Sequence, residues 1–200
     1  MASEAVVDRG DGGVSGSTRG GDPMIVYRTY EGERDLELLM GLVNRELSEP
    51  YSIFTYRYFI YNWPGLCFLA MEGRGGEREE CVGALVCKAE QHKDLVRGYV
   101  AMLVVEKRLR KRGIGRHLAK MGIEEMVRKG CDEVILEAEV TNKGALSLYA
   151  KLGFIRDKRL HKYYLTGTDA FRLKLLVDRN AAATAAATAA GATATATATT

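Results

Sequence analysis

The pattern of apolar and polar positions predicts one folded region, residues 23–178 of the 200-residue chain. Runs rich in β-branched and aromatic residues predict strands at 24–30, 66–72, 81–90, 98–106, 132–140, 154–160 and 169–177. Apolar residues at helical spacing predict helices within 33–47 and 51–64, after the glycines at 113 and 115, and from an Asn142 cap to Gly153. This order predicts an α+β domain in which helices flank a mixed sheet.

Two of the predicted strands differ in the faces that they bury. The segment "GYVAMLVVE" (98–106) is nearly all apolar, as expected for a strand covered on both faces. The segment "DEVILEAEV" (132–140) alternates, so Glu133, Ile135, Glu137 and Glu139 share one face. Because this strand is expected in the centre of the sheet, its acidic face predicts a cleft.

The segment 51–64, "YSIFTYRYFIYNWP", is dense in aromatic residues and is expected to be a helix that ends at Trp63-Pro64. Aromatic stretches are more often core than pocket, so Phe54, Tyr58 and Phe59 are assigned to the core.

Composition separates both ends of the chain from its middle. Residues 1–22 are rich in glycine and poor in large apolar side chains, which predicts a disordered leader. Residues 179–200 form a low-complexity Ala/Thr tail. The 23–178 region between them has the size of one domain with its own core.

Charge and cysteine usage narrow the class of protein. The formal net charge of +3 is too small to indicate nucleic-acid binding by itself. There is no secretory segment and no apolar run of about 20 residues that could span a bilayer. The four cysteines lack CxxC spacing and only three histidines are present, so no metal site is expected. We therefore expect a reduced, soluble, cytoplasmic protein.

The loop "LRKRGIGRHL" (109–118) lies between a buried strand and an amphipathic helix. The first N–H groups of a helix lack intrahelical partners, and Gly113 and Gly115 would let a phosphate approach them closely. Nearby cations add charge: Arg110, Lys111, Arg112 and Arg116. The pattern is neither GxGxxG nor a P-loop, which disfavours a dinucleotide or triphosphate. The alternatives are a solvated basic turn, an import signal or an RNA-binding patch.

The motif Arg-x-x-Gly-x-Gly at 110–115 resembles the pyrophosphate-binding loop of the GCN5-related N-acetyltransferases. The downstream segment "TNKGALSLYAKLGF" (141–154) resembles a second signature of that family. The resemblance implies the family's fold, a mostly antiparallel mixed sheet flanked by helices, and acetyl-CoA as acetyl donor. It implies these cofactor-binding residues: Met102, Leu103, Val104, Arg110, Lys111, Arg112, Gly113, Ile114, Gly115, Arg116, Asn142 and Tyr149.

A closer resemblance, from about 25 to 177, is to the catalytic subunits of NatC-type N-terminal acetyltransferases. It rests on segments such as "LSEPYSIFTYRYFIYNWP" and "FIRDKRLHKYYLTGTDAFRLKLLV". It implies acetylation of nascent protein N-termini that begin with Met and a bulky hydrophobic residue. It also implies a large auxiliary subunit, a small subunit, and contact with the ribosome through the auxiliary subunit, without membrane or direct nucleic-acid binding.

The chemistry of this reaction selects candidate catalytic residues. An α-amine with a pKa of about 7.7–8.0 must lose a proton before it attacks a thioester. Glu137 is the expected base and Glu139 the reserve; the alternative is that both belong to a solvated face. Tyr149 is expected by resemblance to protonate the departing thiolate, although it also fits a core position. Cys87 and Cys131 have no nearby histidine in sequence, which favours direct attack in a ternary complex.

The substrate's N-terminus is expected between two turns. Glu49, Pro50 and Tyr51 form the first turn, and Tyr163 and Tyr164 lie in the second. A carboxylate can hold the amine, and aromatic rings can line an apolar pocket. Two other functions stay open: an internal-lysine or small-amine acetyltransferase of the same fold, and a non-catalytic acetyl-CoA-binding module.

Overall fold

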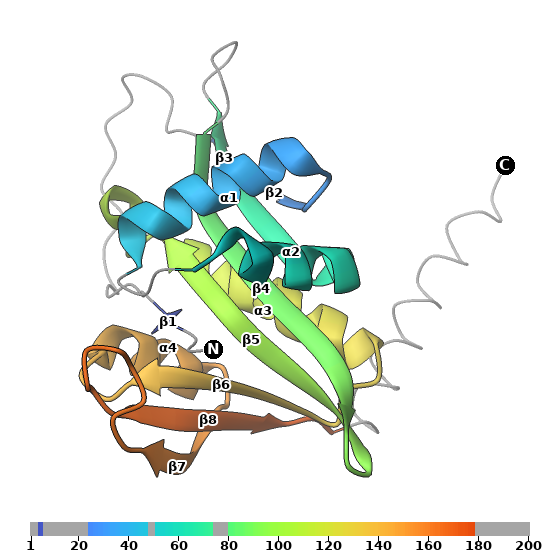
Figure 1. Cartoon of the computed structure of the whole chain (residues 1–200), viewed down its shortest axis with the longest axis vertical. Coiled ribbons are helices and arrows are strands. Elements are labelled where there is room, and N and C mark those ends of the chain that lie inside the picture. Colours follow the sequence, from blue (N-terminus) through green and yellow to red (C-terminus); the bar gives the residue numbers. More distant parts are fainter. Residues whose placement is uncertain (1–3, 6–23, 48–50, 74–79, 179–200) are drawn as a thin grey trace, which may run out of the picture.

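The computed structural model describes residues 4–5, 24–47, 51–73 and 80–178 (Figure 1). The helices are α1 (Glu33–Glu46), α2 (Ile53–Asn62), α3 (Ile114–Arg128) and α4 (Lys143–Lys151). The strands are β1 (Glu4–Ala5), β2 (Met24–Thr29), β3 (Cys67–Gly73), β4 (Glu80–His92), β5 (Leu95–Val105), β6 (Glu133–Glu139), β7 (Ile155–Leu160) and β8 (Ala170–Leu176). Two short 3-10 turns, η1 (Pro64–Leu66) and η2 (Lys107–Leu109), precede β3 and the loop with Gly113 and Gly115, respectively. This loop, residues 110–115, is called the glycine loop below.

The strands form one sheet in the order β2-β3-β4-β5-β6-β8-β7. Neighbours in this order are antiparallel except β5 and β6, which are parallel because α3 connects them. The expected mixed, mostly antiparallel sheet flanked by helices is therefore confirmed. β6 lies between β5 and β8, in the interior position that its sequence predicts.

Each face of the sheet has its own layer of helices and its own core. α1 and α2 cover one face, where Leu39, Val43, Tyr56 and Phe59 pack on residues of β3, β4 and β5. α3 and α4 cover the other face, where their apolar stripes are buried in a second core that includes residues of β3, β4, β5, β6 and β8. The alternation in β6 follows this division, since Leu136 and its apolar neighbours face α3 and α4.

The prediction for the aromatic helix is partly wrong. Phe59 is fully buried, but Phe54 is 77% exposed and Tyr58 is 40% exposed. The inward face of α2 is instead formed by Tyr56, Phe59 and Ile60, which recur at the spacing of one helical turn. Because nearly every position of α2 carries a large apolar side chain, its sequence has little contrast to identify the buried face.

The structure describes only two residues of the segments at the ends of the chain, Glu4 and Ala5. Glu4 and Ala5, within the segment predicted as a leader, form β1 and pair in parallel with Met102 and Leu103 of β5. Most of 1–22 and all of 179–200 lie outside the described residues, so the predictions of a leader and a tail stay predictions. None of the helices in the described ranges is long and apolar enough to cross a bilayer.

Gly122 allows α3 to pack closely on β4. A Cβ atom added there would lie 2.4 Å from Cδ2 of Leu85, which is fully buried. We expect Gly122→Ala to lower the free energy of unfolding by about 1–3 kcal/mol through overpacking. Gly41→Ala in α1 is the matched control, because its Cβ would meet only Arg45 at 3.7 Å. That variant should gain about 0.5–1 kcal/mol of helix stability. Urea unfolding measures the free energy of unfolding of both variants. Equal changes in the two would contradict close packing of α3 on β4 at Gly122.

Candidate active site

A gap opens between β5 and β6 in the middle of the sheet. The two strands pair only where Arg97–Tyr99 meet Glu133–Ile135, although both continue well beyond this pairing. From Val100 onward, β5 therefore has an edge that does not pair with β6, and β1 pairs there at Met102 and Leu103. This edge can form ladder hydrogen bonds with an extended chain that carries amides.

The glycine loop ends at the N-terminus of α3, close to the same gap. Gly113 is the N-cap residue, with a left-handed φ of 82°, and no side chain caps the helix. Lys111 is also left-handed, with a φ of 74°. A Cβ at Gly113 would meet nothing within 4 Å, so the backbone is open on that side. Helix N–H groups beside such a turn form a site for an anion.

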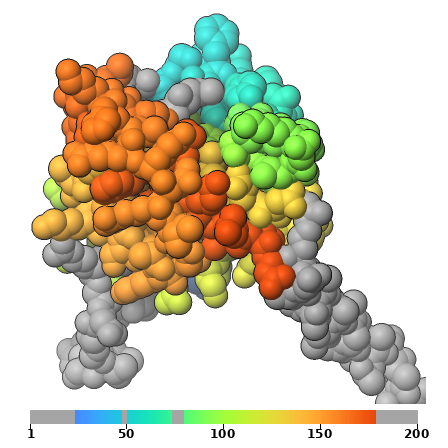
Figure 2. Space-filling view, turned by 90° about the horizontal axis from the view of Figure 1, so that it is seen from below, coloured from blue at the N-terminus to red at the C-terminus, as the bar shows by residue number. Residues whose placement is uncertain are grey.

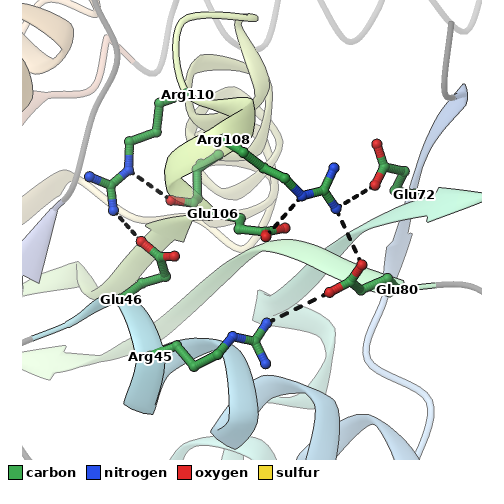
Figure 3. Close-up of polar contacts among 8 residues, drawn as sticks. Arg45, Glu46, Glu72, Glu80, Glu106, Arg108 and Arg110 are labelled. Atoms are coloured by element: carbon green, nitrogen blue, oxygen red, sulfur yellow. Dashed lines mark hydrogen bonds and ion pairs between the residues drawn. The ribbon is translucent and has the colours of Figure 1, made fainter.

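The basic residues of the loop have different environments. Lys111, Arg112 and Arg116 are exposed at the loop and the first turn of α3. Arg110 instead pairs with Glu46 of α1 and donates from Nε to the Val105 carbonyl at 3.0 Å (Figure 3). The guanidinium of Arg110 is thus held by the protein, and the charge at the loop surface comes from the other three residues.

Glu137 lies at the centre of a hydrogen-bonded cluster on the α1–α2 face of the sheet. Its Oε1 accepts from Arg172 Nε at 2.7 Å, and its Oε2 accepts from the Tyr99 hydroxyl at 3.0 Å. The side chain is 1% exposed, which excludes the alternative of a solvated face for Glu137. Glu133, on the same face, is also buried and pairs with Arg97 at 2.6 Å and Lys174 at 3.0 Å. Cations from both neighbouring strands therefore satisfy these carboxylates.

A cavity of about 270 Å³ opens above Glu137. Its walls come from α2, from the β4–β5 hairpin and from the β7–β8 segment, which gather on one face of the molecule (Figure 2). They include Phe59, Lys88, Tyr99, Tyr163 and Arg172. Burial, followed by the charge of Glu137, raises the pKa of Tyr99 and raises that of Tyr163 to about 12. Both phenols are therefore neutral donors beside the carboxylate at physiological pH.

The predicted substrate residues meet only in part. Tyr163 lines the cavity, whereas Tyr164 is 6% exposed and packs edge-on against Tyr163, with ring centroids 5.3 Å apart. Tyr51 packs against Tyr56 and lies close enough to Tyr99 to contribute to its raised pKa.

Glu49 and Pro50, the other predicted substrate residues, lie outside the described residues. Glu139, the reserve base, is half-buried and does not line the cavity formed by the described residues.

Tyr149 and Asn142 lie on the opposite side of β6, at α4. Tyr149 is 1% exposed and packs against Phe154 at 5.3 Å, which confirms its place in the core. Burial raises the pKa of its phenol, so the hydroxyl keeps its proton at neutral pH. The amide oxygen of Asn142 accepts from the Ala145 N–H at 3.0 Å and caps α4 as expected.

Sequence reasoning missed Tyr99 and Arg172. Their signal lies in the alternation of their strands: Arg172 and Lys174 are cations on one face of the otherwise apolar strand "AFRLKLL". A buried acidic row on one strand needs cations on its neighbours, because unpaired buried charges are costly. The register that places Arg172 opposite Glu137, however, exists only in the folded sheet.

The features fit coenzyme A in two respects. Its extended pantetheine arm carries amides that match the edge of β5 at Met102–Val104, which does not pair with β6. Its pyrophosphate is an anion that matches the glycine loop and the start of α3. Ile114 and Gly115 are buried beneath that loop and hold the helix start against the sheet.

The comparison with known families agrees with this geometry. Residues 36–154 match the model of the acetyltransferase (GNAT) family, so the chain belongs to that family.

Several relatives are more specific. The chain is 60% identical to N-alpha-acetyltransferase MAK3 of Arabidopsis thaliana over 152 residues, 76% of this chain and 77% of that protein. It is 57% identical to N-alpha-acetyltransferase 30 of Xenopus laevis over 171 residues, 84% of this chain but 61% of that protein. A solved chain described as "the NatC complex bound to Gag peptide and CoA" is similar with a TM-score of 0.75 and 42% identity, covering 77% of this chain and 99% of that one. The chain thus spans about three-fifths of the Xenopus protein, and the predicted resemblance is confirmed.

Proposed function

We propose that this chain is the catalytic subunit of a NatC-type N-terminal acetyltransferase. It would transfer acetyl from acetyl-CoA to the α-amine of protein N-termini that begin with Met and a bulky hydrophobic residue. The observation that carries the proposal is the position of Glu137, beneath a cavity and beside the gap between β5 and β6. The names of the relatives, and a similar chain described as bound to a peptide and CoA, support the same activity.

Acetyl-CoA would supply an activated acetyl thioester, and this chain's backbone would hold most of it. The β5 edge at Met102, Leu103 and Val104 would bind the pantetheine arm, and residues 111–116 would bind the pyrophosphate. Binding along β5 requires the two pairs made by β1 to give way, which is a small cost for a two-residue strand.

Glu137 would accept the proton that the α-amine must lose. A carboxylate has about four acceptor positions, and we propose that an amine or a bridging water shares those of Glu137 with Tyr99, Tyr163 and Arg172. These contacts also fix the carboxylate's orientation, which limits the reorganisation needed during proton transfer.

Tyr149, on the other side of β6, is the proposed proton donor to the departing thiolate. The phenol is protonated at neutral pH, as this role requires. All four cysteines are buried, and none of them forms a disulfide bond. Burial raises the pKa of the Cys67, Cys81 and Cys87 thiols, which makes them poor nucleophiles. Direct attack by the amine is therefore preferred over an acyl-enzyme.

The substrate's first residues would occupy the cavity lined by Phe59, Tyr99 and Tyr163. We propose that Glu49, Pro50 and Tyr51 complete this site and that Glu49 holds the amine. The auxiliary and small subunits belong to the same proposal, which the similarity to a chain of a NatC complex supports. Contact with the ribosome through the auxiliary subunit and a cytoplasmic location are proposed from the sequence resemblance alone.

Selectivity for the second residue tests the proposed substrate class. Burying a Leu or Phe side chain in aromatic walls is worth about 1.5–3 kcal/mol, whereas an acidic residue would lose hydration and meet Glu137 and Glu49. Met-Leu peptides should therefore exceed Met-Glu peptides by at least about tenfold in kcat/KM. Steady-state rates on two peptides that differ only at that residue measure the ratio. Equal values would contradict the proposed pocket while leaving the cofactor site in place.

A further inference from the structure

The Arg110 side chain joins two segments that are 64 residues apart in the sequence. Its Nη2 donates to Oε2 of Glu46, and its Nε donates to the Val105 carbonyl at 3.0 Å (Figure 3). The Arg110 and Glu46 side chains are only 22% and 13% exposed, which limits screening of their interaction by solvent. A charge-assisted hydrogen bond of this kind holds its partners in a defined geometry.

On one side, this ion pair fixes the glycine loop. Arg110 directly precedes Lys111, whose φ of 74° is unfavourable for a residue with a Cβ atom. Such a conformation persists only where neighbouring contacts hold the backbone in place. Arg110 is anchored on one side of Lys111, and Gly113 begins α3 on the other, so the anchor shapes the loop proposed to bind pyrophosphate.

On the other side, the ion pair fixes the end of α1. Glu46 is the last residue of α1, and Leu47, which follows it, is buried in the same core cluster as Tyr56, Phe59 and Met102. Phe59 also lines the cavity above Glu137. A shift at the end of α1 would therefore reach the wall of the peptide site through closely packed side chains.

We propose that the Glu46–Arg110 ion pair couples the acetyl-CoA loop to the peptide site, so that coenzyme A binding strengthens peptide binding. An anion bound at residues 111–116 orders the loop, and Arg110 transmits that order to the end of α1. Glu46 and Arg110 are thus positioning residues. The inference rests on the proposed function, and linkage requires that the peptide strengthen coenzyme A binding by the same factor.

A neighbouring network provides a matched control. Arg108, two residues before Arg110, pairs with Glu72 of β3 at 2.5 Å, with Glu80 at 3.2 Å and with Glu106 at 2.9 Å (Figure 3). Glu72→Gln removes the same charge as Glu46→Gln and loosens the same loop, but Glu72 tethers it to β3 rather than to α1.

Calorimetry on the full chain tests the coupling, with CoA and a Met-Leu peptide as ligands so that no acetyl transfer occurs. We expect saturating CoA to lower the peptide Kd of the unaltered protein at least about fivefold. Glu46→Gln and Arg110→Gln should each reduce this factor to less than about twofold, and the double variant should lose no more than either single one. Glu72→Gln should keep the full factor.

Three results would overturn the inference. One is an equal peptide Kd with and without CoA in the unaltered protein. Another is a Glu46→Gln protein that melts at a lower temperature but keeps the full factor, because the ion pair would then be only structural. The third is an equal loss in Glu72→Gln, which would assign the effect to general loosening of the loop. Failure of the unaltered chain to bind CoA at all would contradict the proposed function itself.

Discussion

Replacing Glu137 with glutamine should lower kcat by about 100-fold or more, the usual scale for a positioned acid or base. The amide keeps the size of the side chain but cannot accept the amine proton. CoA affinity should change little, because Glu137 lies on the peptide side of the gap. Steady-state kinetics with a Met-Leu peptide and calorimetry with CoA measure the two quantities.

The structural cost of that substitution needs a control, because Glu137→Gln also leaves Arg172 without its buried charge partner. Glu133→Gln is matched: Glu133 lies on the same face of β6, is also buried, and pairs with Arg97 and Lys174. It should destabilise the fold to a similar extent and retain most of kcat. If Glu139→Gln lost activity while Glu137→Gln kept it, the base would be Glu139 instead.

The second large effect is expected at Gly113. Gly113→Val should raise the CoA dissociation constant at least about tenfold, or 1.4 kcal/mol, because its side chain occupies the space through which a pyrophosphate approaches the backbone. The variant also forces a branched residue into a left-handed conformation.

Gly130→Val separates these two effects. Gly130 has the same φ of 82° and the same open surroundings, but it lies at the far end of α3. Both variants should lose similar stability in thermal unfolding, and only Gly113→Val should lose CoA affinity. Equal loss of CoA affinity in the two proteins would show that strain, rather than a phosphate site, explains the result.

The parts of this molecule that the sequence predicted depend on local patterns. The period of two in 132–140 identifies the acidic face of β6, and the glycines at 113 and 115 identify the loop before α3. Asn142 and Gly153 likewise mark the ends of α4 through cap geometry that involves only neighbouring residues. Local spacing was enough to predict Glu137 as a candidate base.

The parts that were missed depend on which strands become neighbours. The partners of Glu137 come from β5 and β8, and Arg172 is 35 residues away along the chain. No local pattern encodes that register, so the sequence did not show that this acidic row is buried and paired. The partner of Arg110 could not be predicted for the same reason, because Glu46 lies at the end of α1, 64 residues earlier in the chain.

The proposed function requires that the site act on an α-amine, and one peptide distinguishes this from action on a lysine. A Met-Leu peptide with a single internal lysine offers both kinds of amine, and tandem mass spectrometry after incubation with acetyl-CoA locates the acetyl group. The lysine ε-amine has a pKa of about 10.4 against about 7.7–8.0 for the α-amine, and the cavity above Glu137 would receive a chain end. We expect acetyl on the α-amine with the lysine unmodified, whereas acetyl on the lysine with a free α-amine would exclude an N-terminal acetyltransferase.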